Sequence, residues 1–385
     1  MVKRFAFAVP GDLSAPTGGY AYDRRMIAEL RQLGWWIDII ELGDGFPRPS
    51  IEVMAAARTR LASVQAGLPI VIDGLAFGAL PDAAAALRGR NPLIALVHLP
   101  LALEPGLDGA IARILRESER EALACAHHAV VTSPMTARIL VADYGVASDR
   151  LTVARPGIDR VTPRPRSAGR DVALLAVGSV VPGKGYDTLI DALGRFRALP
   201  WRLLIVGNRK GNLDTTTALD AQIARLGLSG RVRFAGALAP DQVAAQYQAA
   251  DVFVLPSRFE TYGMVYAEAM ANGLPIVATT AGAIPDTVPA SAGVLVPTDD
   301  AAALAAALGS LITDPAERAR LAAGARAAGA VLPSWADSAR IFSEMLKQIV
   351  AGRYHRSSVS AKVYDETAGI KANRARRRGP KRGQA

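Results

Sequence analysis

The sequence has a single cysteine, Cys125, among its 385 residues. One cysteine excludes an intramolecular disulfide and a cysteine-rich metal site. No apolar run is long enough to span a bilayer. The first residues, Met1–Val9, lead straight into Pro10-Gly11 without the apolar core of a secretory signal. We therefore expect a cytoplasmic protein.

Three patterns that hold metals or activated nucleophiles are also missing. There is no Asp-x-Asp pair, which argues against a metal-held diphosphate. No group of His, Cys and carboxylate residues has the spacing of metal ligands, and no Gly-x-Ser-x-Gly elbow occurs. We expect no metal and no cofactor. A diphosphate leaving group would then have to be neutralised by backbone amides and cationic side chains.

Acidic residues are scarce at the C-terminal end. The net charge of the chain is +10, but residues 351–385 contain ten Lys or Arg and two acidic residues and so carry +8 of it. The other 350 residues carry only +2, so the overall charge does not predict a nucleic-acid partner. The basic tail is predicted to be disordered. Two roles stay open for it: a peripheral contact with an anionic membrane, at the inner membrane face, or a solubilising end without a partner.

Short apolar runs alternate with helical patterns along most of the chain. This alternation predicts βαβ units and parallel sheets that are covered on both faces. The chain is too long for one ordinary core, and a Pro- and Arg-rich stretch over 155–170 reads as a linker. We predict four parts: a Rossmann-like domain over 1–160, a second over 161–334, a helix over 335–352 and the tail over 353–385.

The stretch 251–285 is the most informative part of the sequence. It reads as a strand, a polar loop with Glu260, a helix opened by Gly263 that carries Glu268, and a second strand. Free amides at a helix start favour an anion, and glycine lets a phosphate approach the backbone. Glu268 is suited to accept hydrogen bonds from ribose hydroxyls, and Glu260 to face a sugar. The alternatives are a helix-surface carboxylate and a solvated loop residue.

Four other residues are candidates for a ligand site. Lys184 lies in a glycine-rich turn between a strand and a helix, where a cation suits a diphosphate; the alternative is a solvated lysine. His98 ends a buried apolar run, at the strand end where α/β proteins bind ligands; the alternative is a core histidine. Gly18 and Gly19 are expected in a long loop before a helix that starts at Tyr20. They either bring amides to a ligand or make the turn.

With these residues assembled, the chain resembles the retaining glycosyltransferases of glycosyltransferase family 4. The likeness is carried by Glu260 to Pro275, which is similar to the family's E-x7-E motif and the turn after it. Supporting matches are Tyr247, Ala250–Ser257, the Val177–Gly185 loop, Val206-Gly207, Phe234–Gly236, Arg155–Asp159, Gly18-Gly19 and His98. The resemblance covers about residues 1–350 and is stronger over 172–297 than in the N-terminal half.

The resemblance implies the GT-B fold, in which two Rossmann-like, doubly wound parallel-sheet domains face a central cleft. It implies a metal-independent hexosyltransferase that acts with retention and moves a hexose from a nucleotide diphosphate sugar to a hydroxyl of a glycan, lipid or small molecule. The N-terminal domain would bind the acceptor and the C-terminal domain the donor, and the terminal helix over 335–352 would pack back on the N-terminal domain. The implied catalytic residues are His98, Lys184 and Glu260. The implied donor-binding residues are Gly18, Gly19, Lys184, Gly207, Gly263, Met264, Val265 and Glu268.

One position departs from the family pattern. Many relatives carry an arginine directly after the glycine of the first phosphate loop, and this chain has Ser179. Phosphate binding then depends more on Lys184. Two other functions stay open: a nucleotide-sugar epimerase or hydrolase on the same fold, and a noncatalytic glycosyltransferase-like subunit.

Overall fold

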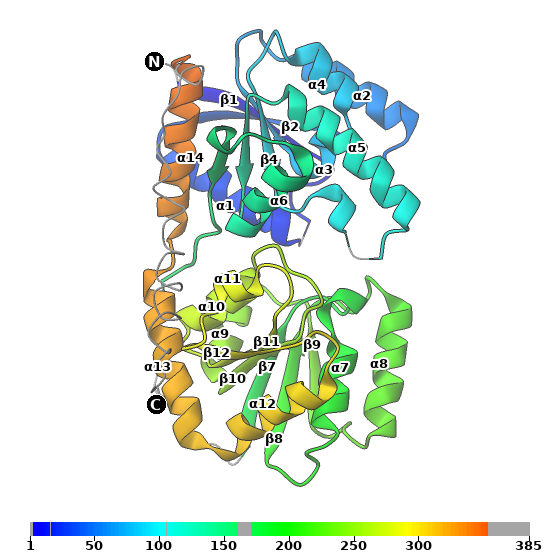
Figure 1. Cartoon of the computed structure of the whole chain (residues 1–385), viewed down its shortest axis with the longest axis vertical. Helices are drawn as coiled ribbons and strands as arrows, with labels where there is room; N and C mark the ends of the chain where they lie inside the picture. Colours follow the sequence, from blue (N-terminus) through cyan, green and yellow to red (C-terminus); the bar gives the residue numbers. More distant parts are fainter. Residues whose placement is uncertain (1–2, 16, 105, 161–170, 353–385) are drawn as a thin grey trace, which may run out of the picture.

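The computed structural model describes residues 3–15, 17–104, 106–160 and 171–352. These residues form two halves, each built on a six-stranded parallel sheet, and the two halves lie one above the other along the long axis of the molecule (Figure 1). The predicted fold class, two doubly wound α/β units, is confirmed. The expected tail over 353–385 and the linker residues 161–170 lie outside the described residues.

The first sheet has the strand order β2-β1-β3-β4-β5-β6. The order reverses between β1 and β3, and in open α/β sheets ligands bind at the carboxyl ends of the strands at such a reversal. Residues that follow β1, β3 and β4 are therefore placed at a potential binding crevice. The strands are β1 Arg4–Val9, β2 Trp36–Glu41, β3 Ile70–Asp73, β4 Leu93–Val97, β5 His128–Val131 and β6 Leu151–Val153.

The second sheet is also parallel and six-stranded, with the order β12-β11-β10-β7-β8-β9. Here the order reverses between β7 and β10, so the loops that follow these two strands are neighbours. The buried apolar runs of the sequence account for the central strands, because a parallel sheet is covered on both faces. The strands are β7 Val172–Val177, β8 Trp201–Val206, β9 Val232–Gly236, β10 Val252–Leu255, β11 Ile276–Thr279 and β12 Gly293–Val296.

Helices cover both faces of the two sheets (Figure 1). Those of the first half are α1 Gly18–Gln32, α2 Ile51–Ala62, α3 Gly74–Phe77, α4 Pro81–Leu87, α5 Gly109–Cys125 and α6 Pro134–Tyr144. Those of the second half are α7 Tyr186–Leu193, α8 Leu213–Arg225, α9 Pro240–Ala249, α10 Met264–Ala271, α11 Ile284–Thr287, α12 Ala301–Thr313 and α13 Pro315–Val331. The last helix, α14 Trp335–Val350, returns to the first half.

Helix α6 is absent from the sequence-based prediction. Its start signal was nevertheless present, because Ser133 caps the helix by accepting a hydrogen bond from the Thr136 amide and Pro134 occupies the first helical position.

The prediction for Gly18 and Gly19 also needs correction. Thr17 caps α1, so the helix begins at Gly18 and both glycines lie in its first turn and not in the loop before it.

The predicted linker is packed where the structure describes it. Ile158 is buried and forms a bridge with Ser334, and the Ser338 hydroxyl donates a hydrogen bond of 2.6 Å to the Arg155 carbonyl. These contacts tie the start of α14 to the end of the first half. From there α14 runs along α1 and buries Trp335 and Phe342 in the same core as the first sheet (Figure 1).

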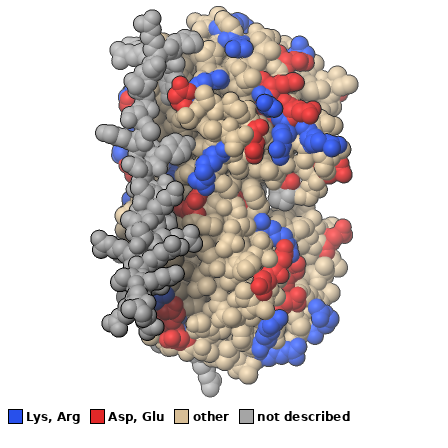
Figure 2. All heavy atoms as spheres, in the orientation of Figure 1, with Lys and Arg blue, Asp and Glu red and all other residues tan. Residues whose placement is uncertain are grey.

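No helix in the described ranges is long and apolar enough to cross a membrane. In the space-filling view, basic and acidic side chains are interspersed over both halves of the visible face (Figure 2). A single-sign electrostatic field therefore does not cover this face. The boundary between the two halves is notched in the same view (Figure 2).

Candidate functional site

The start of α10 offers free backbone amides. Gly263 has φ of 80°, a left-handed conformation, and a Cβ there would lie 2.4 Å from Cδ2 of Tyr266, so the position requires glycine. The Tyr266 hydroxyl donates to the Leu255 carbonyl and fixes the helix on β10. Within the described part of the chain, the amides of Gly263, Met264 and Val265 have no acceptor. Such a helix start is suited to bind an anion.

Lys184 and Glu260 meet at the reversal of the second sheet. Lys184 follows β7 and Glu260 follows β10; Lys184 Nζ lies 2.6 Å from Glu260 Oε1. The Ser257 hydroxyl donates to the same carboxylate oxygen over 2.7 Å. The lysine side chain is 26% exposed and the glutamate 13%, so both remain accessible to a ligand. The structure thus brings together two predicted site residues that are 76 positions apart.

Glu268 is half-buried on α10 and accepts a hydrogen bond of 2.7 Å from the Tyr247 hydroxyl. Burial raises the pKa of Glu268; the Tyr247 hydrogen bond lowers it in part and the charge of Asp159 adds to the rise. An ionised carboxylate has about four acceptor sites, of which Tyr247 uses one. Glu268 therefore retains the capacity to accept hydrogen bonds from hydroxyl groups of a ligand.

Gly207 follows β8 and packs against the loop after β7. A Cβ at this position would lie 1.9 Å from the Gly178 carbonyl oxygen, so close backbone contact explains the glycine. Ser179 is the next residue of that loop. Many members of the family that the sequence resembles have an arginine at the position of Ser179. Arg258 does not take its place, because Asp187 and Asp299 bind the Arg258 guanidinium at 2.7 Å each. Lys184 is therefore the cation that the structure places beside Glu260.

His98 belongs to a cluster at the carboxyl ends of the first sheet. Its Nε2 lies 3.0 Å from Asp23 Oδ1 and 3.6 Å from Asp73 Oδ2. Asp23 comes from α1, and Asp73 ends β3. Both carboxylates are almost fully buried, whereas the histidine side chain is 19% exposed. His98 is thus neither an isolated core histidine nor a solvated one.

Electrostatics favour protons on this cluster. Burial raises the pKa of Asp73 to about 7, and the neighbouring Asp23 charge adds to that rise. Burial alone lowers the pKa of His98, but the two carboxylates outweigh it and the net shift is upward. These shifts favour a cationic His98 beside an Asp73 carboxyl that titrates near neutral pH.

The ligand atoms of this cluster lie within 4.8 Å of one another, and it is the one such group in the ranges that the structure covers. We do not assign a metal there. The contact between Nε2 and Oδ1 already has the length of a hydrogen bond, and shared protons supply the positive charge that the carboxylates need.

Two contacts relate the halves to each other. Met264, the first residue of α10, packs against the core cluster that contains Tyr22, and the ring of Tyr22 meets that of His98 at 5.2 Å between centroids. On another side, Arg138 of α6 forms an ion pair of 2.6 Å with Asp286 of α11. The free amides of α10 therefore lie against the half of the molecule that carries His98.

Sequence reasoning did not identify Asp23 and Asp73 as members of the site. Asp73 could have been found, because it ends a buried strand just as His98 follows one. Asp23 carries no such signal, since it sits inside a helix and is brought to His98 only by the packing of α1 on the sheet. Met264 and Val265 offer free backbone amides at the start of α10, and their side chains pack against the core clusters.

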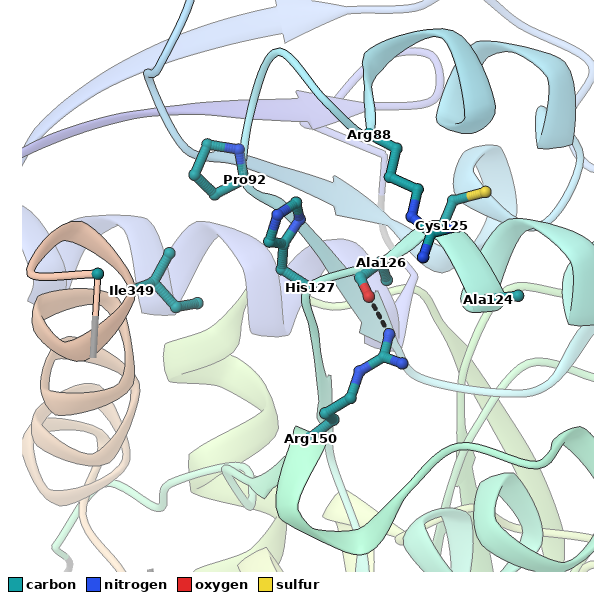
Figure 3. Close-up of a pocket in the computed structure, with 9 residues that line it drawn as sticks. Arg88, Pro92, Ala124, Cys125, Ala126, His127, Arg150 and Ile349 are labelled. Atoms are coloured by element: carbon teal, nitrogen blue, oxygen red, sulfur yellow. Dashed lines mark hydrogen bonds between the residues drawn. The ribbon is translucent and has the colours of Figure 1, made fainter. Parts of the chain in front are cut away.

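A cavity of about 370 Å³ lies away from these clusters, near the amino ends of β4 and β5. Arg88, Cys125, His127 and Arg150 line it, and Ile349 of α14 closes one side (Figure 3). Arg150 donates to the Ala126 carbonyl and holds the wall of the cavity. This position is opposite to the strand ends where ligands bind in α/β folds.

Two family models match the chain. The model described as glycosyl transferases group 1 matches residues 171–314, and that of glycosyltransferase family 4 matches residues 36–161. Together they cover the whole second sheet and the first sheet except β1, and they include the predicted residues His98, Lys184, Glu260 and Glu268.

Curated relatives point the same way. A D-inositol 3-phosphate glycosyltransferase of Acidothermus cellulolyticus is 32% identical over 314 residues, which are 77% of this chain and 64% of that protein. An MMP alpha-(1->4)-mannosyltransferase of Mycolicibacterium hassiacum is 28% identical and is matched over 78% of its length, with 80% of this chain covered. The chain thus spans somewhat less than two thirds of the first of these relatives.

Solved structures share the fold. Sucrose-phosphate synthase from Thermosynechococcus elongatus superposes with a TM-score of 0.77 at 22% identity, over 91% of this chain and 100% of that one. Anabaena HepE in complex with UDP-glucose gives 0.69 at 20% identity, over 90% and 99%. At these identities the likeness concerns the arrangement of the two halves and not the chemistry.

Proposed function

Because the chain belongs to glycosyltransferase family 4, we propose that it transfers a hexose from a nucleotide diphosphate sugar to an acceptor hydroxyl, with retention of configuration. The observation that carries the proposal is the contact of Lys184 with Glu260, three residues before the free amides that begin at Gly263. A cation and a set of amides are the groups that a metal-free site uses to stabilise a departing diphosphate.

The second half is the proposed donor side. In this assignment the amides of Gly263 to Val265 and the Lys184 ammonium bind the diphosphate, and Glu268 accepts hydrogen bonds from the ribose hydroxyls. Glu260 faces the transferred sugar, and His98 approaches it from the first half. The first half then binds the acceptor, and α14 supports the arrangement by packing on α1.

The proposed reaction exchanges two bonds at the anomeric carbon. The bond from C1 to the diphosphate oxygen breaks, and a bond from C1 to the acceptor oxygen forms on the same face of the sugar. The acceptor proton passes to the departing diphosphate oxygen. Negative charge grows on that diphosphate as the bond breaks, so Lys184 and the amides of α10 stabilise the transition state more than the ground state.

A panel of nucleotide sugars tests this proposal. UDP-, GDP- and ADP-hexoses are added to the full chain, and the midpoint of thermal unfolding is measured for each. A donor present at about 100 times its Kd stabilises the protein by ~2.7 kcal/mol. UDP-glucose is the first choice, because the similarly folded HepE is described in complex with it. The donor that stabilises selectively is then offered with glycan, lipid and small-molecule acceptors.

Three outcomes decide between this proposal and its alternatives. Transfer of the hexose to an acceptor with the donor's anomeric configuration, seen by NMR of the product, supports the proposal. Quantitative release or epimerisation of the sugar in the presence of acceptors contradicts it. Stabilisation by no nucleotide sugar at saturating concentration also contradicts it.

A further inference from the structure

We propose that Asp23 is a positioning residue for His98. Together with Asp73 it holds the imidazole ring through Nε2, so that Nδ1 is the nitrogen presented to the transferred sugar. This inference rests on the proposed function, because it concerns the site in which His98 meets the donor. It adds a residue for which the sequence motifs assign no role.

Both carboxylates approach the same ring nitrogen. Asp23 Oδ1 lies 3.0 Å from Nε2, and Asp73 Oδ2 lies 3.6 Å from it. Asp73 is itself fixed, since its Oδ1 accepts a hydrogen bond of 2.8 Å from the Leu75 amide at the start of α3. In the ranges that the structure describes, Nδ1 of His98 has no hydrogen-bond partner. Nδ1 is therefore the ring nitrogen left for a ligand.

The ring is held on two further sides. Tyr22 meets it edge to face at 5.2 Å between centroids, and its own hydroxyl donates 2.9 Å to the Ala154 carbonyl. On the other side, a Cβ on Gly19 would lie 3.4 Å from Cδ2 of His98, so this glycine brings the backbone of α1 close to the ring. One helix, α1, thus supplies three of the groups around the imidazole: Gly19, Tyr22 and Asp23.

The charges that face the ring favour its cationic form. Asp23 from α1 and Asp73 from β3 are the carboxylates in contact with it. Tyr20 also lies near these acids, and burial together with the charges of Asp73, Asp23, Asp44 and Asp12 raises its pKa to about 12, so it is neutral at pH 7. With both ring nitrogens protonated, Nε2 donates to Asp23 and Nδ1 donates to a sugar hydroxyl.

Asp23 has a buried oxygen that the ring does not satisfy. Its Oδ2 has no hydrogen-bond partner among the described groups, and the residue is fully buried. Since the pKa of Asp73 is raised to about 7, a proton on Asp73 is available for the neighbouring carboxylate. This arrangement keeps Oδ1 of Asp23 directed at His98 and explains why a buried acid is tolerated inside α1.

Kinetics of two variants separate the charge from the position. In Asp23→Asn an oxygen acceptor remains at Oδ1 and the charge is lost, so kcat is expected to fall about 10-fold. In Asp23→Ala the ring loses its anchor, and kcat is expected to fall about 100-fold, with a much smaller change in the donor KM. Glu29→Gln, a carboxylate-to-amide change on the same helix away from His98, is the matched control with unchanged kcat.

NMR of the histidines tests the same inference without activity. The chain has four histidines, and His98→Gln assigns the resonance. We expect Nε2 to stay protonated in the wild type, His98 to remain an imidazolium above its ordinary pKa, and Asp23→Asn to lower that pKa. The alkaline limb of the kcat profile should move to lower pH in the same variant.

Opposite results would overturn the inference. These are an unchanged His98 titration and unchanged kcat profile in Asp23→Asn, or stoichiometric Zn²⁺ binding by the wild type that His98→Gln and Asp23→Asn abolish. If Asp23→Ala does not fold, the isosteric Asp23→Asn still decides. If the wild type transfers no sugar from any donor, the proposed function fails, while the NMR titration still decides the role of Asp23.

Discussion

The two halves of the molecule are both built on a doubly wound, six-stranded parallel sheet and differ in the chemistry at the strand ends. In each sheet the order reverses beside the first strand, between β1 and β3 in one half and between β7 and β10 in the other. The first half places buried acids and a histidine there, with His98, Asp23 and Asp73 in contact. The second half places free amides and the Lys184–Glu260 pair there.

The comparison shows that the position of a binding crevice and the kind of ligand that it suits have different causes. The topology decides where a crevice forms, because parallel strands end at one edge and the reversal leaves a gap between the flanking loops. The side chains decide which ligand suits it. Amides and a lysine suit an anion, whereas a histidine beside buried carboxyl groups suits a neutral, hydroxyl-rich group.

Lys184→Ala should give the largest effect. The departing diphosphate loses its side-chain cation, so we expect kcat to fall about 10²–10³-fold with a smaller change in the donor KM. Lys347→Ala, an exposed lysine on α14, is the control. Steady-state kinetics with the selected donor measure both. A larger loss in His98→Gln than in Lys184→Ala would break the comparison, because the first half would then carry most of the catalysis.

Glu268→Gln should give the second-largest effect. A carboxylate that accepts hydrogen bonds from ribose hydroxyls contributes about 1.5–3 kcal/mol, so the donor KM should rise about 10–100-fold while kcat changes little. Glu344→Gln on α14 is the control. Isothermal titration with the free nucleoside diphosphate checks binding directly. Unchanged affinity would remove Glu268 from the donor site and leave it with its Tyr247 contact alone.

Gly263→Ala should reduce stability. The left-handed conformation costs about 1–2 kcal/mol for a residue with a Cβ, and the contact with Tyr266 adds to that cost. Gly227→Ala is the matched control, since Gly227 has φ of 67° but nothing within 4 Å of its Cβ position. Urea unfolding should show a larger loss for Gly263→Ala. Equal losses would mean that the tight start of α10 relaxes freely.

Asp73→Asn should change how stability depends on pH. The folded pKa of Asp73 is raised to about 7, above its ordinary value, so the unfolded chain releases this proton first. The contribution of Asp73 is therefore greatest at low pH and is lost as pH rises from about 4 to 7. Unfolding midpoints of the two proteins should converge or cross over that window. Parallel curves for the wild type and the variant would contradict the buried, proton-sharing cluster of the first half.

Removal of residues 356–385 should have the smallest effect on catalysis. None of the predicted site residues falls in this range of the sequence, so kcat should stay the same. If the basic tail mediates peripheral contact with an anionic membrane, its removal should reduce sedimentation with anionic vesicles at low salt. Equal sedimentation of the full and shortened chains would leave the tail as a solubilising end.

The sequence predicted most of the second half and less of the first. Glu260, Gly263 and Glu268 lie within one local stretch, so their spacing could be read directly and α10 begins where glycine indicated. The first-half site is assembled from residues that are far apart in the chain. Asp23 and His98 are separated by 75 positions, and nothing in either local pattern reports the other.

The linker over 155–170 is a second case in which the local sequence pattern did not predict a tertiary contact. Its composition of proline and arginine indicated an unstructured connection, yet Ile158 is buried and pairs with Ser334. Helix α14 makes that packing possible by returning to the first half. The family resemblance implied this partner, whereas the amphipathic pattern of the helix alone does not indicate it. Composition describes a segment, whereas burial depends on what lies against it.

The sequence by itself determined the alternation of strands and helices, the two α/β units, and the glycine and glutamate pattern of α10, because these depend on interactions between near neighbours in the chain. Tertiary structure alone decided the contact of Lys184 with Glu260 and the placement of Asp23 and Asp73 on one nitrogen of His98. These contacts form because a parallel sheet brings the carboxyl ends of strands from distant parts of the chain to one edge, and because α1 packs beside that edge with Asp23 directed at His98.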